Sequence, residues 1–270
     1  MRIGIIQMNS NENKEHNLAR ARSMLQTLVE KGAEFVMLPE HFNFIGNDAQ
    51  KQTEAEHIDD SLTRALLSQW AKTFGIYLHS GSFLEREGEN IYNASYVFDP
   101  SGETLAHYRK IHLFDVEVEG GIQYRESDTV TGGSRVVTFD AAGYTFGMAT
   151  CYDLRFPELF RTLLDRGSEV LLIPAAFTVQ TGRDHWQLLL RARAVENLCW
   201  VLAANQWGPS APHNYCYGRS MVVDPWGTVI GTAVDGEQTL LVEIDRSIIT
   251  ERRKSFPATE HRRPELFQYG

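Results

Sequence analysis

The 270-residue sequence has few cysteines, no long apolar run and no basic stripe before its last residues. Its three cysteines, Cys151, Cys199 and Cys216, are an odd number without a Cys-x-x-Cys pair, which suggests neither a disulfide framework nor a zinc site. No segment approaches roughly 18 uninterrupted apolar residues, and the apolar start is too short for a secretion signal. We therefore expect a cytoplasmic protein.

The chain is acidic, with a formal net charge of −9. This balance argues against nucleic acid or an anionic membrane as its partner. Hydrophobic residues make up 43% of the chain and charged residues 23%, which is typical of a globular protein with a sizeable core. No linker-like composition occurs near residue 140, so we expect one domain over residues 1–270.

Apolar and amphipathic segments alternate in the first half in the order strand, helix, strand, helix, strand, strand. The two helices are expected at residues 14–30 and 61–74, each ended by a glycine. The turn at residues 99–102 has proline early and glycine late, which indicates a hairpin. The strands are expected at residues 3–8, 34–40, 76–84 and 93–98.

The second half repeats this order. The repeat is supported by the likeness of 169–174 to 34–39 and of 220–230 to 96–105. Asp184 and Gln187 are spaced like a capping box at the start of the second helix. The segments expected in the second half are strands at 144–150, 169–174 and 199–205, a strand with its hairpin turn at 220–230, and helices from Pro157 and from about residue 184 to 197.

Each half therefore predicts a sheet covered by helices on one face. The other face of each sheet must also be buried, and the second sheet is its natural partner. We expect an α/β protein folded as a four-layer α-β-β-α sandwich built from two similar halves. One continuous doubly wound sheet would fit parts of the pattern, but the hairpin that ends each half favours two sheets.

Cys151 stands where the strand at residues 144–150 meets the helix that begins at Pro157. A thiol at such a corner, facing the positive end of a helix, is expected to gain thiolate character. A small buried core cysteine is the alternative, because free cysteine is among the most buried residue types. The neighbours that the fold brings to Cys151 decide between these interpretations.

Two further residues are expected at the same end of the sandwich. Glu40 follows a buried strand and could act as a general base for a cysteine nucleophile, while Lys110 lies just beyond the first hairpin. The Lys110 ammonium and the backbone amide of Tyr152 could stabilise the negative charge that grows on a carbonyl oxygen under attack. Taken alone, each of these residues would be interpreted as part of a solvated turn or a charged surface edge.

Together, these residues resemble the nitrilase, or carbon-nitrogen hydrolase, superfamily, and its branch of omega-amidases and deaminated-glutathione amidases. The resemblance implies that Glu40 is the base, Lys110 the oxyanion stabiliser and Cys151 the nucleophile. A second glutamate of the family matches Glu126, with Glu117 and Glu119 as nearby alternatives. The resemblance covers nearly the whole chain and is carried by residues 38–42, 108–114, 151–159, 185–186, 191–194 and 217–227.

Arg155 and Arg183 could each bind a substrate carboxylate through two hydrogen bonds. Arg155 lies within the family motif and could instead brace Glu158. Arg183 departs from the proline or small residue expected at its position, so it either marks substrate preference or is a surface residue.

We therefore expect an amidase that needs no metal and no organic cofactor. It would hydrolyse a small amide through a cysteine thioester and release ammonia. Deaminated glutathione fits the family motifs best; a 2-oxo acid omega-amide is the next candidate, and a nitrile or carbamoyl compound follows. A catalytically silent binding partner with the same fold is the alternative from another class.

The C-terminal segment, about residues 246–270, interleaves basic residues with apolar and aromatic ones. Such a charged cluster usually lies on a solvated face. The interleaved pattern instead indicates an arm that packs on something, and in the resembled family such tails pack against a second subunit. We expect a homodimer or a higher homo-oligomer.

Overall fold

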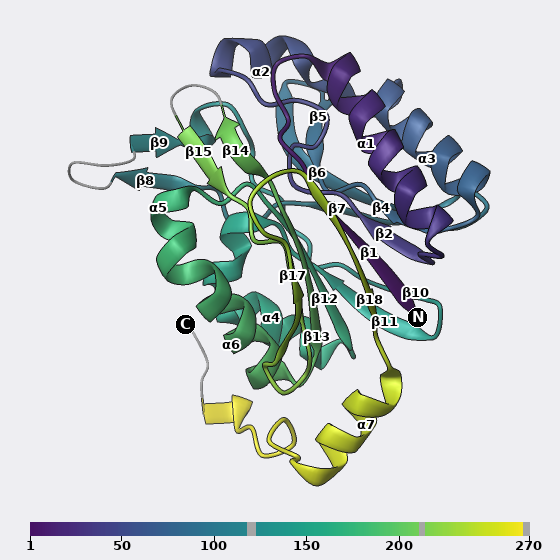
Figure 1. Cartoon of the computed structure of the whole chain (residues 1–270). Helices are drawn as coiled ribbons and strands as arrows, with labels where there is room; N and C mark the ends of the chain where they lie inside the picture. The colour runs from purple at the N-terminus through teal and green to yellow at the C-terminus, as the bar shows by residue number, and fades with distance from the viewer. Residues whose placement is uncertain (118–122, 211–213, 267–270) are drawn as a thin grey trace.

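The computed structural model describes residues 1–117, 123–210 and 214–266, and it contains two sheets that pack face to face. Figure 1 shows helices on the outer side of each sheet, so the predicted four-layer α-β-β-α sandwich is confirmed. The helices that cover the sheets are α1 (Lys14–Glu30), α3 (Leu62–Phe74), α4 (Pro157–Asp165) and α6 (Gln187–Asn197). Among the described residues, no helix is long and apolar enough to cross a membrane.

The first sheet has the order β18-β1-β2-β4-β6-β5-β3, with β7 also paired to β6. β1, β2 and β4 are parallel, and β18 lies antiparallel to β1. The strands of this sheet are β1 (Arg2–Gln7), β2 (Phe35–Met37), β3 (Glu56–His57), β4 (Tyr77–His79), β5 (Phe83–Glu87), β6 (Asn90–Phe98), β7 (Thr104–Arg109) and β18 (Gln238–Glu243).

The second sheet has the order β10-β11-β12-β13-β16-β17. Its three central strands are parallel and follow one another through α4 and α6, as β1, β2 and β4 follow one another through α1 and α3. The predicted repeat is therefore confirmed. The strands of the second sheet are β10 (Thr138–Ala141), β11 (Tyr144–Met148), β12 (Val170–Ala175), β13 (Trp200–Asn205), β16 (Met221–Val223) and β17 (Val229–Thr232).

Three apolar cores hold the layers together. The central core lies between the sheets, where the rings of Phe35 on β2 and Phe146 on β11 stack with their centroids 5.0 Å apart. The second core joins α1 and α3 to the first sheet, and the third joins α4 and α6 to the second sheet. Burying each large apolar side chain contributes about 1.5–3 kcal/mol, so the central core ties the two halves firmly together.

The ends of the main helices follow the signals expected from the sequence. The side chains of Asn13 and Ser61 accept hydrogen bonds from the first turns of α1 and α3. Gly75 ends α3 in the left-handed conformation, and Pro157 begins α4. The starts of α1, α3 and α4 and the stop at Gly75 therefore agree with the helices expected from the sequence.

Other expectations were wrong. The segment at residues 76–84 forms two strands, β4 and β5, because the chain turns between them at Gly81, which has a φ of 62°. Asp184 caps no helix, because α5 (Val179–Thr181), a π-helical turn (Gly182–Trp186) and α6 form one run that begins before it. The sequence pattern also missed β10, β18, α2 (Asp48–Glu54) and β3.

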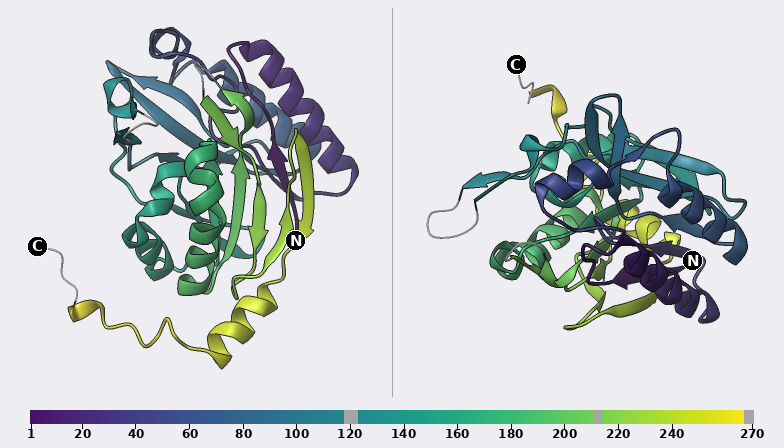
Figure 2. Two further views of the ribbon diagram at one scale, coloured as in Figure 1. Left: turned by 60° about the vertical axis from the view of Figure 1, so that its left-hand side comes forward. Right: turned by 90° about the horizontal axis from the view of Figure 1, so that it is seen from above.

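The C-terminal segment begins with α7 (Arg246–Ser255), which leaves the end of the sandwich. Figure 2 shows the chain beyond α7 running along the outside of the second half. Arg262 forms an ion pair with Asp165 at the end of α4, and the Phe256 ring packs edge-on against Trp226. The arm therefore packs partly on its own chain, yet Phe256 stays 52% exposed and Leu266 63% exposed.

We predict that Gly81→Ala destabilises the fold far more than Gly88→Ala. Both glycines have positive φ, but a Cβ at Gly81 would lie 1.9 Å from the carbonyl oxygen of Pro39, whereas nothing lies within 4 Å at Gly88. Gly88→Ala should cost about 1–2 kcal/mol for its conformation alone. Gly81→Ala should lower the free energy of unfolding, measured with a denaturant, by several kcal/mol. Equal losses for the two variants would show that the chain tolerates a Cβ beside the Pro39 carbonyl oxygen.

Candidate active site

Cys151 lies at a sharp corner between β11 and the 3-10 turn Cys151–Arg155, which leads into α4. Its φ is 49°, a left-handed conformation that is rare for any residue other than glycine and costs of the order of 1–3 kcal/mol. His41 has a similar φ of 54°. Strained residues of this kind persist only where their surroundings hold them, and here both stand in the same pocket.

Glu40 follows β2 at the end of the sheet, where three groups hold its carboxylate. Oε1 accepts hydrogen bonds from Asn93 Nδ2 at 2.8 Å and from Lys110 Nζ at 3.2 Å. Oε2 accepts a hydrogen bond from the backbone amide of Ala176 at 2.7 Å. Only 2% of the Glu40 surface is exposed, so the orientation of its carboxylate is fixed.

Lys110 follows β7 and lies between two buried carboxylates. Its ammonium donates to Glu40 Oε1 at 3.2 Å and to the two Glu126 oxygens at 2.7 and 3.0 Å. Glu126 Oε2 also accepts a hydrogen bond from the backbone amide of Phe114 at 2.7 Å. The Lys110 ammonium is therefore held by carboxylates on two sides, which fixes its orientation.

These distances distinguish Glu126 from the alternatives for the second glutamate. Glu126 is 3% exposed and contacts Lys110 directly. Glu117 ends β8 (Asp115–Glu117) with an exposed side chain, and Glu119 lies outside the described residues. The structure therefore brings Glu126, and not Glu117, to Lys110.

Burial and charge set the protonation states of this cluster. Burial alone raises the pKa of Glu40, but the Lys110 ammonium and hydrogen bonds more than offset it, so the pKa of Glu40 falls below its ordinary value. Burial alone lowers the pKa of Lys110, but Glu126 and Glu40 raise it well above its usual range. An ionised Glu40 and a charged Lys110 are therefore the resting state.

Cys151 behaves differently from the sequence-based expectation. Burial and the neighbouring charge of Glu40 raise the pKa of its thiol well above the ordinary value, although Lys110 acts in the opposite direction. The expected thiolate character at rest is therefore wrong. Cys151 rests as a thiol, so an attack by its sulfur would require a neighbouring base to take the proton.

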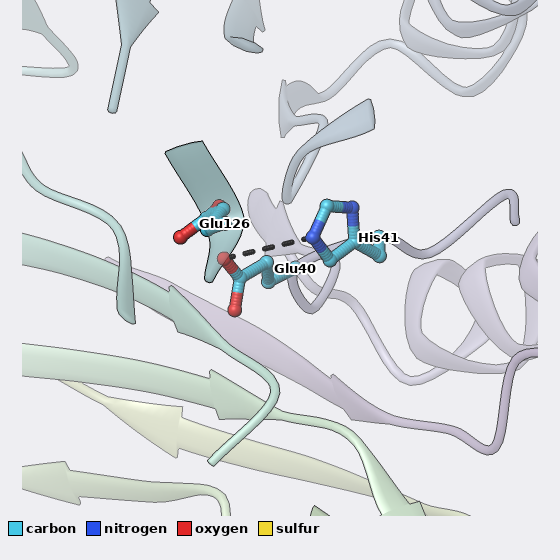
Figure 3. A group of neighbouring side chains, drawn as sticks. All are labelled: Glu40, His41 and Glu126. Atoms are coloured by element: carbon cyan, nitrogen blue, oxygen red, sulfur yellow. Dashed lines mark ion pairs between the residues drawn. The ribbon is translucent and has the colours of Figure 1, made fainter. Parts of the chain in front are cut away.

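Glu40, His41 and Glu126 form a group whose possible ligand atoms lie within 4.8 Å of one another, and Figure 3 shows their side chains converging. Burial lowers the pKa of His41, which favours the neutral imidazole. The Lys110 ammonium already pairs with both carboxylates. A metal ion here would have to displace that ammonium.

A pocket of about 280 Å³ opens above the cluster, with Glu40, Lys110, Glu126 and Cys151 in its lining. Such a volume suits a small molecule. The aromatic part of the wall is formed by Phe44, Phe114, Tyr124, Tyr152, Phe177 and Tyr215.

Arg155 lines the pocket, as does Tyr152. The Arg155 guanidinium lies 5.7 Å from the Tyr152 ring centroid and 5.4 Å from the Phe177 ring centroid. Its Nη1 lies 3.3 Å from Nδ1 of His185. Within the described residues no carboxylate pairs with it, Glu158 included, so its charge remains available to an anion in the pocket.

Arg183 is not brought to the pocket. Its side chain is 72% exposed and pairs with the neighbouring Asp184 at 3.2 Å. The structure thus places it on the surface of the helical run that ends with α6.

Several groups that shape the site were not predicted from the sequence. Asn93 was the first residue of an expected strand, and nothing in the sequence distinguished it from the polar Ser95 of the same strand. Lys51 on α2 donates to Asp48 at 2.7 Å and to the Tyr124 hydroxyl at 2.5 Å on the pocket wall. The Ala176 amide carries no sequence signal, because any residue supplies a backbone N–H.

The comparisons with known proteins agree with this geometry. The family model described as carbon-nitrogen hydrolase matches residues 2–254. The deaminated glutathione amidase of Synechocystis sp. strain PCC 6803 is 39% identical over 263 residues, which cover 95% of this chain and 96% of that protein. Omega-amidase NIT2 of Danio rerio is 36% identical over 266 residues, covering 98% of this chain and 96% of that protein.

Among solved structures, a single-residue mutant of the amidase from Nesterenkonia sp. AN1 superposes with a TM-score of 0.85 at 27% identity, covering 98% of this chain and 95% of that chain. In that structure the acetamide moiety of fluoroacetamide is covalently added at the active-site cysteine. With the family matched over most of its length, the chain belongs to the carbon-nitrogen hydrolase family of the nitrilase superfamily and is a hydrolase of carbon–nitrogen bonds other than peptide bonds.

Proposed function

We propose that the protein hydrolyses a small amide with Cys151 as nucleophile, Glu40 as general base and acid, and Lys110 as oxyanion stabiliser. The observation that carries the proposal is the meeting of these three groups in one buried cluster on the pocket wall. The same cluster argues against a silent binding partner, which would have no need of three aligned reactive groups.

In the first step, Glu40 takes the proton of the Cys151 thiol as the sulfur attacks the amide carbon. The Lys110 ammonium and the backbone amide of Tyr152 stabilise the oxyanion that forms. Glu40 then gives its proton to the leaving nitrogen, the carbon–nitrogen bond breaks and a thioester remains. Water, deprotonated by Glu40, attacks the thioester, and the thiol and the carboxylic acid product are released.

Glu126 has a supporting part in this proposal. Its carboxylate balances the buried ammonium and fixes its direction, so Lys110 can serve the oxyanion without reorganising.

For the substrate we propose deaminated glutathione, with an omega-amide of a 2-oxo acid as the alternative. Both choices rest on the similar amidases and on Arg155, whose guanidinium suits a carboxylate. The leaving groups differ. An omega-amide releases ammonia, whereas the amide nitrogens of deaminated glutathione carry carbon substituents, so that its hydrolysis yields an amine. The release of ammonia expected from the sequence therefore applies to the omega-amide and not to deaminated glutathione. Measuring both products over a panel of amides distinguishes the two substrates.

We further propose that the chain is one domain, works in the cytoplasm and assembles at least as a homodimer through the arm beyond α7. Phe256 and Leu266 support the assembly, because both remain exposed on an arm that is otherwise anchored to its own chain.

We expect Glu40→Gln and Cys151→Ala each to lower kcat by several orders of magnitude while the circular dichroism spectrum stays unchanged. The two residues act as one unit, so the double variant should be no worse than either single variant. Cys199→Ala is the matched control, since that buried cysteine lies outside the pocket lining. Near-normal turnover of either variant would remove that residue from the mechanism.

We expect Arg155→Lys to keep the positive charge but to lose the bidentate hydrogen bonding to a substrate carboxylate. It should raise KM for carboxylate-bearing amides by ~10-fold, which corresponds to about 1.4 kcal/mol, and leave a neutral amide of similar size nearly unaffected. Steady-state kinetics with matched acidic and neutral amides measure this. Equal losses for both substrates would make Arg155 structural.

Truncation after Ser255 keeps α7 and removes the arm. If the arm joins two subunits, the mass seen by light scattering should fall toward that of one chain. A full-length protein that is monomeric at micromolar concentration would contradict the proposed dimer.

A further inference from the structure

Behind the catalytic cluster lies a second buried carboxylate, that of Asp153, which is fully buried. Its Oδ2 accepts hydrogen bonds from the Tyr108 hydroxyl at 2.6 Å and the Thr150 backbone amide at 2.8 Å. Its Oδ1 lies 2.9 Å from the His112 backbone amide and 2.7 Å from Nδ1 of the same residue. Both oxygens are therefore bound by donors from two separate stretches of chain.

These two stretches are the ones that carry the reacting groups. Tyr108 and His112 stand two residues before and two residues after Lys110. Thr150 immediately precedes Cys151, and Asp153 itself stands two residues after it. One carboxylate thus fastens the chain on both sides of Lys110 to the chain on both sides of Cys151.

We propose that Asp153 is a positioning residue that sets the distance and direction between the Lys110 ammonium and the Cys151 thiol. The inference rests on the roles proposed above for those two groups. Asp153 itself touches neither substrate nor sulfur in this scheme and acts through the backbone on either side of them.

The strained corner at Cys151 explains why such a fastening is needed. A residue with a φ of 49° returns to an ordinary conformation unless its surroundings hold it. The hydrogen bond from the Thr150 amide to Asp153 holds the chain just before the corner. On the far side, the His112 ring stacks on Phe156 at a centroid distance of 3.7 Å, just after the turn that carries the thiol.

Only a carboxylate satisfies this set of partners. Each oxygen accepts from a backbone N–H, of Thr150 on one side and of His112 on the other. An asparagine would place its NH₂ group against one of these donors whichever way it is turned. Asp153→Asn therefore keeps the shape of the side chain but loses the hydrogen bond from the backbone amide of either Thr150 or His112.

We expect Asp153→Asn to lower kcat by about 100-fold, the scale of a misplacement of about 1 Å, with little change in KM. Glu169→Gln is the matched control. Glu169 is also a buried carboxylate that binds a backbone amide and an arginine, but it precedes β12, whereas Ala176 of the site follows the same strand. The control should keep the kcat of the wild type.

A second readout separates positioning from mere stability. The rate at which iodoacetamide alkylates Cys151 is measured against pH, with no substrate present. Glu40 and Lys110 are the charged groups that act on the thiol, and the other charged or titratable side chains of the same pocket include His41, Lys51, Glu126 and Arg155. A nearby ammonium favours the thiolate, so moving Lys110 away should shift the profile to higher pH, while Glu169→Gln keeps the profile of the wild type. Asp153→Asn also removes a negative charge, which acts in the opposite direction, so the shift is read in Tyr108→Phe, which keeps the charge of Asp153.

Tyr108→Phe provides the milder test if Asp153→Asn does not fold. It keeps the buried ring and removes only the hydrogen bond to Oδ2, so we expect a several-fold loss of kcat and a shift of the alkylation profile to higher pH. A variant with the kcat and the alkylation profile of the wild type, whatever its melting temperature, overturns the inference and leaves the proposed reaction intact. Wild-type protein in which Cys151 alkylates no faster than Cys199 overturns both.

Discussion

The structure depends on the burial of one ammonium between two carboxylates. Glu40, Lys110 and Glu126 are each no more than 3% exposed, and isolated charges at such depth would be very costly. Their mutual pairing makes the burial tolerable, and in return it fixes the direction of every side chain involved. Burial and the neighbouring charge of Glu40 raise the pKa of the Cys151 thiol.

The sandwich fold positions Glu40, Lys110 and Glu126. Glu40 follows a strand of the first sheet, Cys151 follows a strand of the second, and Ala176 follows another strand of the second sheet. Parallel strands of both sheets therefore end at the same side, and the residues just after them meet there. The central core holds the two sheets in a fixed relative position, so rigid elements position the residues on both walls of the site.

Much of this arrangement could be predicted from residue order. Glu40 and Cys151 each follow an apolar strand, and the repeat predicts that both strands end at the same side of the sandwich. The choice among Glu117, Glu119 and Glu126 could not be made, because it depends on how a loop folds back onto Lys110. The sequence predicted that the pKa of the Cys151 thiol would be lowered by the start of the helical turn that follows it. The pKa is raised instead, because the effects of burial and of the Glu40 charge are larger. Arg183 was a candidate for binding a substrate carboxylate only because the sequence does not reveal that its side chain is exposed.

The pairing of β18 with β1 has a consequence for the order in which the protein can be made. β18 occupies the edge of the first sheet that β10 occupies in the second, and its register joins Arg2 to Glu243. The second sheet is assembled from consecutive segments, but the first stays incomplete until nearly the whole chain has left the ribosome. The half that carries Glu40 and Lys110 is therefore finished last, although it is synthesised first.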